Sequence, residues 1–485
     1  MRRLLPFLGC LAAGGVLLAV FGPGDPPGPG TAPGASPGPA GSPAARARAD
    51  LVAGARAYLR EHPTDARAWT ALGGAHLDEA GRTGDPAHYT MARSAFRHSL
   101  SLSPEADAMI GMGVVANVRH EHGAARVWGA RAFRAAPHRW PLYGVLAGAY
   151  TGLGRYGRAD LALRRMLGGT PDVAALTRAA DLLRVRGESG RARAVLRRAG
   201  LAAASSASSA DVARYAYGLG ELEWSLGRPR QAVRAYGRAL AADPGHAPAY
   251  AGRARAEAAL GLTGAAVRDY GAAAARDPGY TADLGELYEY LGQPERAARQ
   301  YALFTSYGLA RVDVLRAGRF EADHGDPASA VRRLRAEWNG HRAPEVADAL
   351  AWALHRAGHN AEAATYAARA EPPGARDALA AYHRGEIARA LGDTVSARAH
   401  LARALRINPY FSLDGAPRAR QALIELPKAP PPPPPPPPSP KPTAPAKAAP
   451  SATPTPKPSP TTVKATKAAK PQPKHSATAA GRRPA

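Results

Sequence analysis

The stretch ARYAYGLGELEWSLGRPRQAVRAYGRALAADPGH at residues 213–246 is followed directly by APAYAGRARAEAALGLTGAAVRDYGAAAARDPGY at residues 247–280. Both stretches have 34 residues and share glycine at position 15, alanine at 20 and 27, tyrosine at 24 and proline at 32. Apolar residues recur three and four apart, which predicts two amphipathic helices of about a dozen residues each. The glycine is expected to end the first helix in a left-handed turn, and the proline to stop the second. Each stretch therefore predicts one helical hairpin.

Weaker copies of this pattern extend over residues 50–427, and Pro137 and Pro171 are again 34 residues apart. We expect about ten such units, three of them degenerate. A hairpin of this kind buries its apolar face only against its neighbours, so a run of them builds a solenoid instead of one compact core. Leu51–Leu59 and Arg418–Leu423 are expected to cover the two ends. A Ser/Ala-rich stretch, Ala202–Ala210, is expected to widen one loop.

The spacing resembles the tetratricopeptide repeat (TPR) family, whose units are helix-turn-helix hairpins. The resemblance implies an all-α, right-handed superhelical solenoid that binds protein or peptide partners in a concave groove. Positions 2, 5, 9 and 12 of a first helix line this groove in the family, and position 9 of the next repeat lies beside them. Carried over, the partner-binding residues are Arg214, Tyr217, Glu221, Trp224 and Arg255. An exposed Tyr and Trp beside Arg is typical of an interaction hot spot; the alternative is that these side chains are solvated or pack between repeats.

The N-terminus has the order of an export signal. Arg2 and Arg3 precede an apolar run, so residues 1–22 are predicted to be a signal peptide or a membrane anchor, and residues 23–49 a Pro/Gly/Ala-rich linker. The missing Ala-x-Ala site favours the anchor. Either form places the bulk of the chain outside the cytoplasm. The single cysteine, Cys10, lies inside the run, and its lipidation stays open.

The segment 428–485 has a different composition. It opens with nine prolines, 430–438, which favour extended polyproline II, so we expect a disordered tail. It carries ten positive residues, including all eight lysines of the chain, and no acidic residue. Such a tail is expected to attract anionic cell-wall polymer or lipid headgroups. Without an aromatic-and-basic motif, and with an export signal, nucleic acid is not expected as a partner.

The sequence shows no motif for an active site or a phosphate loop, so we expect no catalytic residues, no cofactor and no enzyme activity. The densest group of metal-ligand types is His120-Glu121-His122, between the helices of one repeat. We interpret it as a solvated turn, because two neighbouring loop ligands do not complete a metal site.

These patterns favour a non-enzymatic scaffold of the bacterial cell envelope that binds partner proteins. Two alternatives stay open: an accessory or regulatory subunit of a membrane enzyme or transporter, and a wall-polymer-binding protein that acts through its basic tail. The sequence does not identify the partner.

Overall fold

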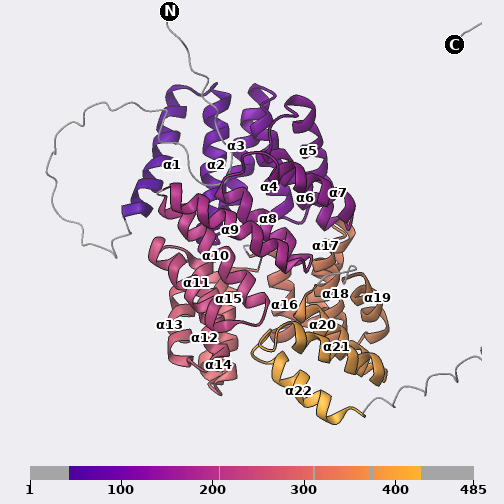
Figure 1. Cartoon of the computed structure of the whole chain (residues 1–485). Coiled ribbons are helices and arrows are strands. Elements are labelled where there is room, and N and C mark those ends of the chain that lie inside the picture. Colours follow the sequence, from indigo (N-terminus) through magenta and orange to yellow (C-terminus); the bar gives the residue numbers. More distant parts are fainter. Residues whose placement is uncertain (1–42, 207, 310–311, 371–375, 428–485) are drawn as a thin grey trace, which may run out of the picture. The chain divides into compact units, whose positions relative to one another are not determined.

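The computed structural model describes residues 43–206, 208–309, 312–370 and 376–427. Within these ranges every regular element is a helix, and there is no strand (Figure 1). The predicted signal peptide or membrane anchor, residues 1–22, most of the predicted linker, residues 23–42, and the predicted tail, residues 428–485, lie outside the described residues. No helix in the described ranges is both long and apolar enough to cross a membrane.

Twenty of the helices form ten hairpins, which confirms the all-α solenoid of about ten units. In chain order the pairs are α2 (Ala66–Thr83) and α3 (Ala87–Leu102), α4 (Ala106–Val118) and α5 (His122–Ala135), α6 (Pro141–Gly152) and α7 (Tyr156–Leu167), α8 (Val173–Val185) and α9 (Ser189–Ser206), α10 (Ser209–Ser225) and α11 (Pro229–Ala242), α12 (Ala247–Ala259) and α13 (Thr263–Ala274), α14 (Thr281–Tyr290) and α15 (Pro294–Tyr307), α16 (Val314–His324) and α17 (Pro327–Gly340), α18 (Pro344–Arg356) and α19 (Asn360–Ala370), and α20 (Ala378–Ala390) and α21 (Thr394–Ile407). A 3-10 turn, Pro278–Tyr280, precedes α14.

The turn within a hairpin is closed by a glycine in the left-handed region. Gly227 has φ 67°, and the next amide, of Arg228, donates to the carbonyl of Glu223 at 2.9 Å. This hydrogen bond satisfies a carbonyl that the end of α10 would otherwise leave free. Because an L side chain is strained at this φ, the glycine at position 15 is a backbone requirement.

The two helices of a hairpin approach closely where the repeat has small residues. The ring of Tyr236 on α11 is fully buried between Gly220 and Gly252, and a Cβ atom at either glycine would lie under 3 Å from the ring. Ala232 on the same helix is also fully buried. The small residues therefore make room for the tyrosine that recurs at position 24.

Single helices cover both ends of the stack. The first is α1 (Pro43–Glu61), whose Leu59 packs with Leu72 of α2. It begins at Pro43, inside the predicted linker 23–49, because proline suits a first helical position and the following Ala/Arg sequence favours helix. The last is α22 (Gly415–Glu425), whose Ala419 and Ala422 join the apolar core of α20 and α21.

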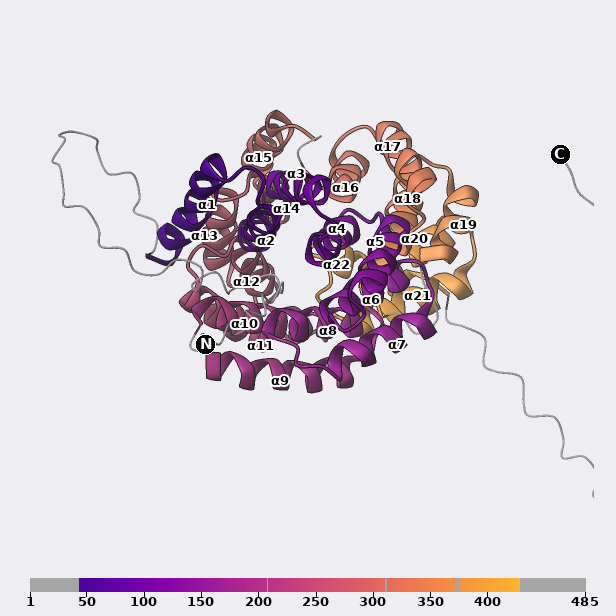
Figure 2. The same cartoon turned by 90° about the horizontal axis from the view of Figure 1, so that it is seen from above.

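Hairpins far apart in the sequence also contact one another. Helix α2 lies beside α12 (Figure 2), and the guanidinium of Arg82 donates to the carbonyl of Gly245 at 3.2 Å. The buried side chain of Asn408, after α21, donates to the carbonyl of Trp224 at 2.9 Å. The inner face of these repeats is therefore partly covered by other repeats of the same chain.

Candidate functional site

Three of the five residues predicted to bind partners, Glu221, Trp224 and Arg255, come together on α10 and α12. Glu221 lies at their centre: its Oε1 accepts from the hydroxyl of Tyr236 at 2.6 Å and from Arg255 at 3.1 Å. The guanidinium of Arg255 lies 4.6 Å from the centre of the Trp224 ring, a cation–π distance. These side chains therefore form one network between two neighbouring repeats.

The expectation that Trp224 is exposed is wrong, because its residue is only 7% exposed. Arg255 lies over its ring, and the following turn packs against Asn408 and Pro409. The Trp224 side chain packs with residues of its own and the next repeat, whereas the contact of the following turn with Asn408 and Pro409, from a repeat far along the chain, leaves no signal in the sequence. Trp224 has a packing role in this structure.

Tyr217 and Arg214 are partly buried and have partners within the chain. The Tyr217 ring lies 4.9 Å from the ring of His246, and Arg214 lies 3.9 Å from Asp78 of α2. Burial lowers the pKa of His246 to about 4, so its neutral ring accepts from the amide of Ala249 at 3.1 Å and caps α12. Most polar groups of the predicted site thus satisfy one another.

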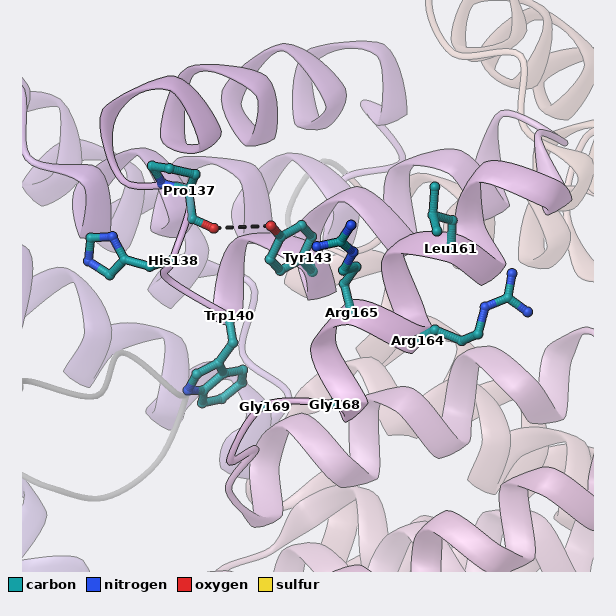
Figure 3. Close-up of a pocket in the computed structure, with 9 residues that line it drawn as sticks. All are labelled: Pro137, His138, Trp140, Tyr143, Leu161, Arg164, Arg165, Gly168 and Gly169. Atoms are coloured by element: carbon teal, nitrogen blue, oxygen red, sulfur yellow. Dashed lines mark hydrogen bonds between the residues drawn. The ribbon is translucent and has the colours of Figure 1, made fainter.

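A second surface, which the sequence analysis did not single out, lies on α6 and α7 (Figure 3). It is an open cavity of about 480 Å³. Its lining combines aromatic, apolar and basic side chains, namely Pro137, His138, Trp140, Tyr143, Leu161, Arg164, Arg165, Gly168 and Gly169. We call this surface the Trp140 surface. The hydroxyl of Tyr143 donates to the carbonyl of Pro137 at 3.0 Å, which fixes the ring at its edge.

The Trp140 surface offers groups that the fold leaves available. Leu161 is 55% exposed, and the exposed Arg165 forms no ion pair within the described ranges, whereas Arg164 pairs with Asp160 at 2.5 Å. Phe133 of α5, also exposed, lies edge-on to Tyr143. Trp, Tyr and Arg around an apolar centre are the residue types enriched at interaction hot spots. The sequence feature that could have indicated this surface is Leu161, an apolar residue on the outward face of the second helix of its hairpin.

The turn between α4 and α5 also differs from its interpretation as solvated. His122 is buried, at 8% exposure, and Glu345 of α18 lies close to both histidines. Burial lowers the pKa of His122; burial also opposes protonation of His120, but the nearby Glu345 carboxylate outweighs it and raises the pKa of His120. The fold thus supplies a third residue that two neighbouring loop positions lacked.

One of three comparisons with known proteins bears on the hairpin architecture. The sequence profile of the tetratricopeptide repeat matches residues 213–246, the stretch from which the repeat was read. A search of curated proteins found no match. Among solved structures, the human IFIT1 dimer with PPP-AAAA has a TM-score of 0.35 at 14% identity, covering 70% of this chain and 72% of that chain. The human IFIT1 dimer with m7Gppp-AAAA has a TM-score of 0.33 at 14% identity, covering 70% and 71%.

The match covers one hairpin, and the structure repeats that hairpin on both sides of it with the same glycine turns. Residues 213–246 therefore match the tetratricopeptide repeat, and the hairpins on both sides of them share its helix-turn-helix architecture.

Proposed function

We propose that this chain is a non-enzymatic scaffold that holds protein partners outside the cytoplasm of a bacterial cell. Tetratricopeptide hairpins stack into large surfaces suited to protein binding. The part of the proposal that concerns location rests on the order of Arg2, Arg3 and the apolar run after them. An accessory subunit of an envelope enzyme would share these features and differ in having one stoichiometric partner.

The Trp140 surface is the observation that carries the binding role. Its apolar lining residue Leu161 is more than half exposed, and Arg165 is exposed without a carboxylate partner in the described ranges. A partner segment that places an apolar side chain against Leu161 and a carboxylate against Arg165 would satisfy both. By contrast, Glu221 and Arg255 are already paired with each other. We therefore place partner binding on α6 and α7 ahead of the predicted α10 cluster.

The test compares two variants in one affinity purification from native membranes in mild detergent. Leu161→Glu should deplete the co-purified proteins, because it puts a charge at the apolar centre and opposes an acidic partner. Leu303→Glu is the matched control, since Leu303 also lies on a second helix and is 53% exposed. Equal recovery of partners by both variants would contradict a binding role for this surface.

The location has its own test, independent of partners. Protease added outside intact cells should digest the solenoid, and a reporter fused after residue 427 should be active outside the cytoplasm. A reporter active only inside the cytoplasm would contradict the proposed location.

A further inference from the structure

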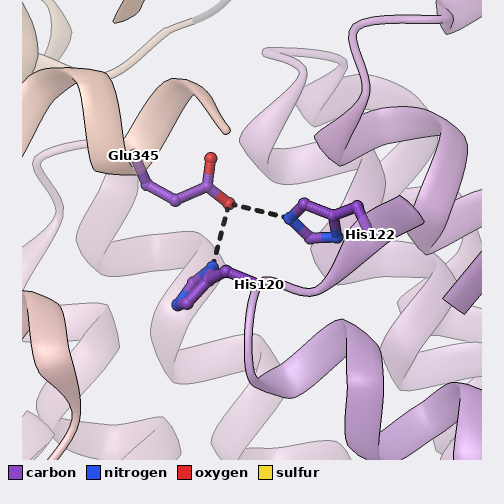
Figure 4. A group of neighbouring side chains, drawn as sticks. All are labelled: His120, His122 and Glu345. Carbon is purple, nitrogen blue, oxygen red and sulfur yellow. Dashed lines mark ion pairs between the residues drawn. The ribbon is translucent and has the colours of Figure 1, made fainter. Parts of the chain in front are cut away.

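The structure brings three potential metal ligands together from distant repeats. His120 lies in the turn between α4 and α5, His122 is the first residue of α5, and Glu345 lies in the first turn of α18 (Figure 4). One ligand atom from each residue lies within 4.8 Å of the others. Two imidazoles and one carboxylate are a ligand set that binds Zn²⁺ and leaves a fourth position open.

Both histidine nitrogens that face the carboxylate lack a hydrogen-bond partner. His120 Nδ1 lies 3.6 Å and His122 Nε2 lies 3.9 Å from the same oxygen, Glu345 Oε1. Both nitrogen atoms are buried, and these distances are too long for hydrogen bonds. Buried polar atoms are nearly always satisfied, so two such atoms around one carboxylate oxygen require an explanation.

A neighbouring amide fixes the proton on His122. The side-chain nitrogen of Asn117 donates to the carbonyl of Val145 at 2.9 Å, which leaves Asn117 Oδ1 to accept from His122 Nδ1 at 3.3 Å. The proton therefore lies on Nδ1, and Nε2 presents its lone pair to Glu345 Oε1. A lone pair facing a carboxylate is unfavourable without a cation between them. An outer hydrogen bond of this kind is typical of a metal-bound histidine.

His120 has a similar outer neighbour. Asp313 caps α16: its Oδ1 accepts from the amides of Leu315 and Arg316. Its other oxygen lies 3.9 Å from His120 Nε2, on the far side of the ring from Glu345. With an ion bound at Nδ1, the ring proton would lie on Nε2, toward this carboxylate.

The backbone gives a second, independent observation. His120 has φ 59° and is the one non-glycine residue of the described ranges with a positive φ. The corresponding turns of other hairpins have glycine there, including Gly154, Gly187 and Gly227. Histidine is strained at this φ, and strain of this kind is concentrated at functional sites. The turn thus retains an imidazole where glycine would relieve the strain.

We propose that His120, His122 and Glu345 bind one divalent first-row transition cation, with Zn²⁺ as its representative. Metal–ligand distances of about 2.0–2.2 Å place the ligand atoms of a tetrahedral site roughly 3.4 Å apart. The two contacts with Glu345, 3.6 and 3.9 Å, are close to this separation, and side-chain rotation closes the wider histidine pair. The ion would cross-link the second hairpin to the ninth and leave a position for water or a partner's side chain.

The experiment measures Zn²⁺ binding by titration calorimetry on untagged, chelator-treated full-length protein. A polyhistidine purification tag would itself bind Zn²⁺, so it is removed and only the chain's own 15 histidines remain. We expect one equivalent of Zn²⁺ to bind and to raise the melting temperature. Mg²⁺ and Ca²⁺ should do neither, because these ions prefer all-oxygen sites.

Two variants decide between a metal site and an ion pair. His120→Gly suits the left-handed turn, so the metal-free protein should melt no lower than the wild type, while Zn²⁺ affinity falls by more than about 100-fold, beyond the loss typical of an outer-shell change. Glu345→Gln should also lose the affinity. His359→Gln is the matched control, since His359 is an exposed residue in another hairpin turn and should leave binding unchanged. Absence of one-to-one binding in the wild type, or unchanged affinity in either cluster variant, would overturn the proposal.

Discussion

At the scale of single residues, the fold depends on where a side chain has no room. Gly220 and Gly252 touch the buried ring of Tyr236 from two helices, whereas Gly271 on α13 has open space around the position of a Cβ atom. The same substitution is therefore expected to have opposite effects at two helical glycines of neighbouring repeats.

We predict that Gly220→Ala lowers the free energy of unfolding by about 1–3 kcal/mol, because the added methyl group overpacks against Tyr236. Gly271→Ala should raise it by about 0.5–1 kcal/mol, because alanine favours helix where nothing obstructs it. Urea unfolding followed by circular dichroism measures both. A loss of stability in both variants, or in neither, would contradict the close contact between the helices.

Glu257 provides a prediction for pH. It is buried on α12, and burial, with the nearby Asp269, raises its pKa to about 7, while Arg253 partly opposes this. The folded state therefore holds a proton that the unfolded state has released above pH about 4.5, so this residue makes the protein less stable as pH rises from about 4.5 to about 7.

Glu257→Gln removes this titration. The variant should match the wild type near pH 4.5 and exceed its unfolding free energy by on the order of 1–3 kcal/mol at pH 8. Urea unfolding at the two pH values tests it, with the exposed Glu295→Gln as the control that should change little at either. If the gain in unfolding free energy of Glu257→Gln did not grow with pH, the Glu257 carboxyl would not titrate between pH about 4.5 and about 7.

At the scale of elements, the helix boundaries follow local chemistry. The predicted wide loop at Ala202–Ala210 is wrong: α9 continues to Ser206, because alanine favours helix and serine does not stop it. The glycine turns are where the sequence and the backbone agree most closely, with Gly261 at φ 74° as an example.

We predict that Gly261→Ala lowers the free energy of unfolding by about 1–2 kcal/mol through backbone strain alone, because no atom lies near its Cβ position. Gly264→Ala, in the adjacent first turn of α13, lacks a positive φ and should be neutral or stabilising. Thermal melting of the pair isolates the turn. Equal melting temperatures of Gly261→Ala and Gly264→Ala would show that the turn adjusts its backbone to accept alanine without strain.

At the scale of the whole molecule, repeats that are distant in the sequence contact one another through hydrogen bonds. Asn408 is 3% exposed, and its amide reaches the carbonyl of Trp224. We predict that Asn408→Ala lowers the free energy of unfolding by about 0.5–1.5 kcal/mol, because it removes this buried hydrogen bond while the Trp224 carbonyl still accepts from the amide of Gly227, and that amide exchange becomes faster around residues 224–230. The substitution of an exposed residue, Gln421→Ala, is the control. Unchanged amide exchange in Asn408→Ala would contradict a stabilising role for the hydrogen bond between Asn408 and Trp224.

The C-terminal segment, residues 428–485, gives a second prediction at this scale. Its ten positive charges have no acidic neighbour, so the full-length chain should co-sediment with anionic vesicles or wall polymer, and less so as salt rises from about 0.05 to 0.5 M. A truncation after Lys428 keeps Pro427, whose carbonyl accepts from Arg398 at 2.9 Å, and should lose most of this binding. Equal, salt-insensitive sedimentation of both would show that the tail only acts as a spacer.

The amino-acid sequence by itself determined the hairpin, its glycine turn and the small residues that seat Tyr236, because these depend on contacts within one repeat or between neighbours. It also placed Glu221 beside Arg255, one repeat apart. Only the tertiary structure decided that Asn408 reaches the carbonyl of Trp224 and that Glu345 joins His120 and His122. Those contacts depend on how far the stack curves before its repeats meet again, and small rotations summed over many repeats leave no local pattern in the sequence.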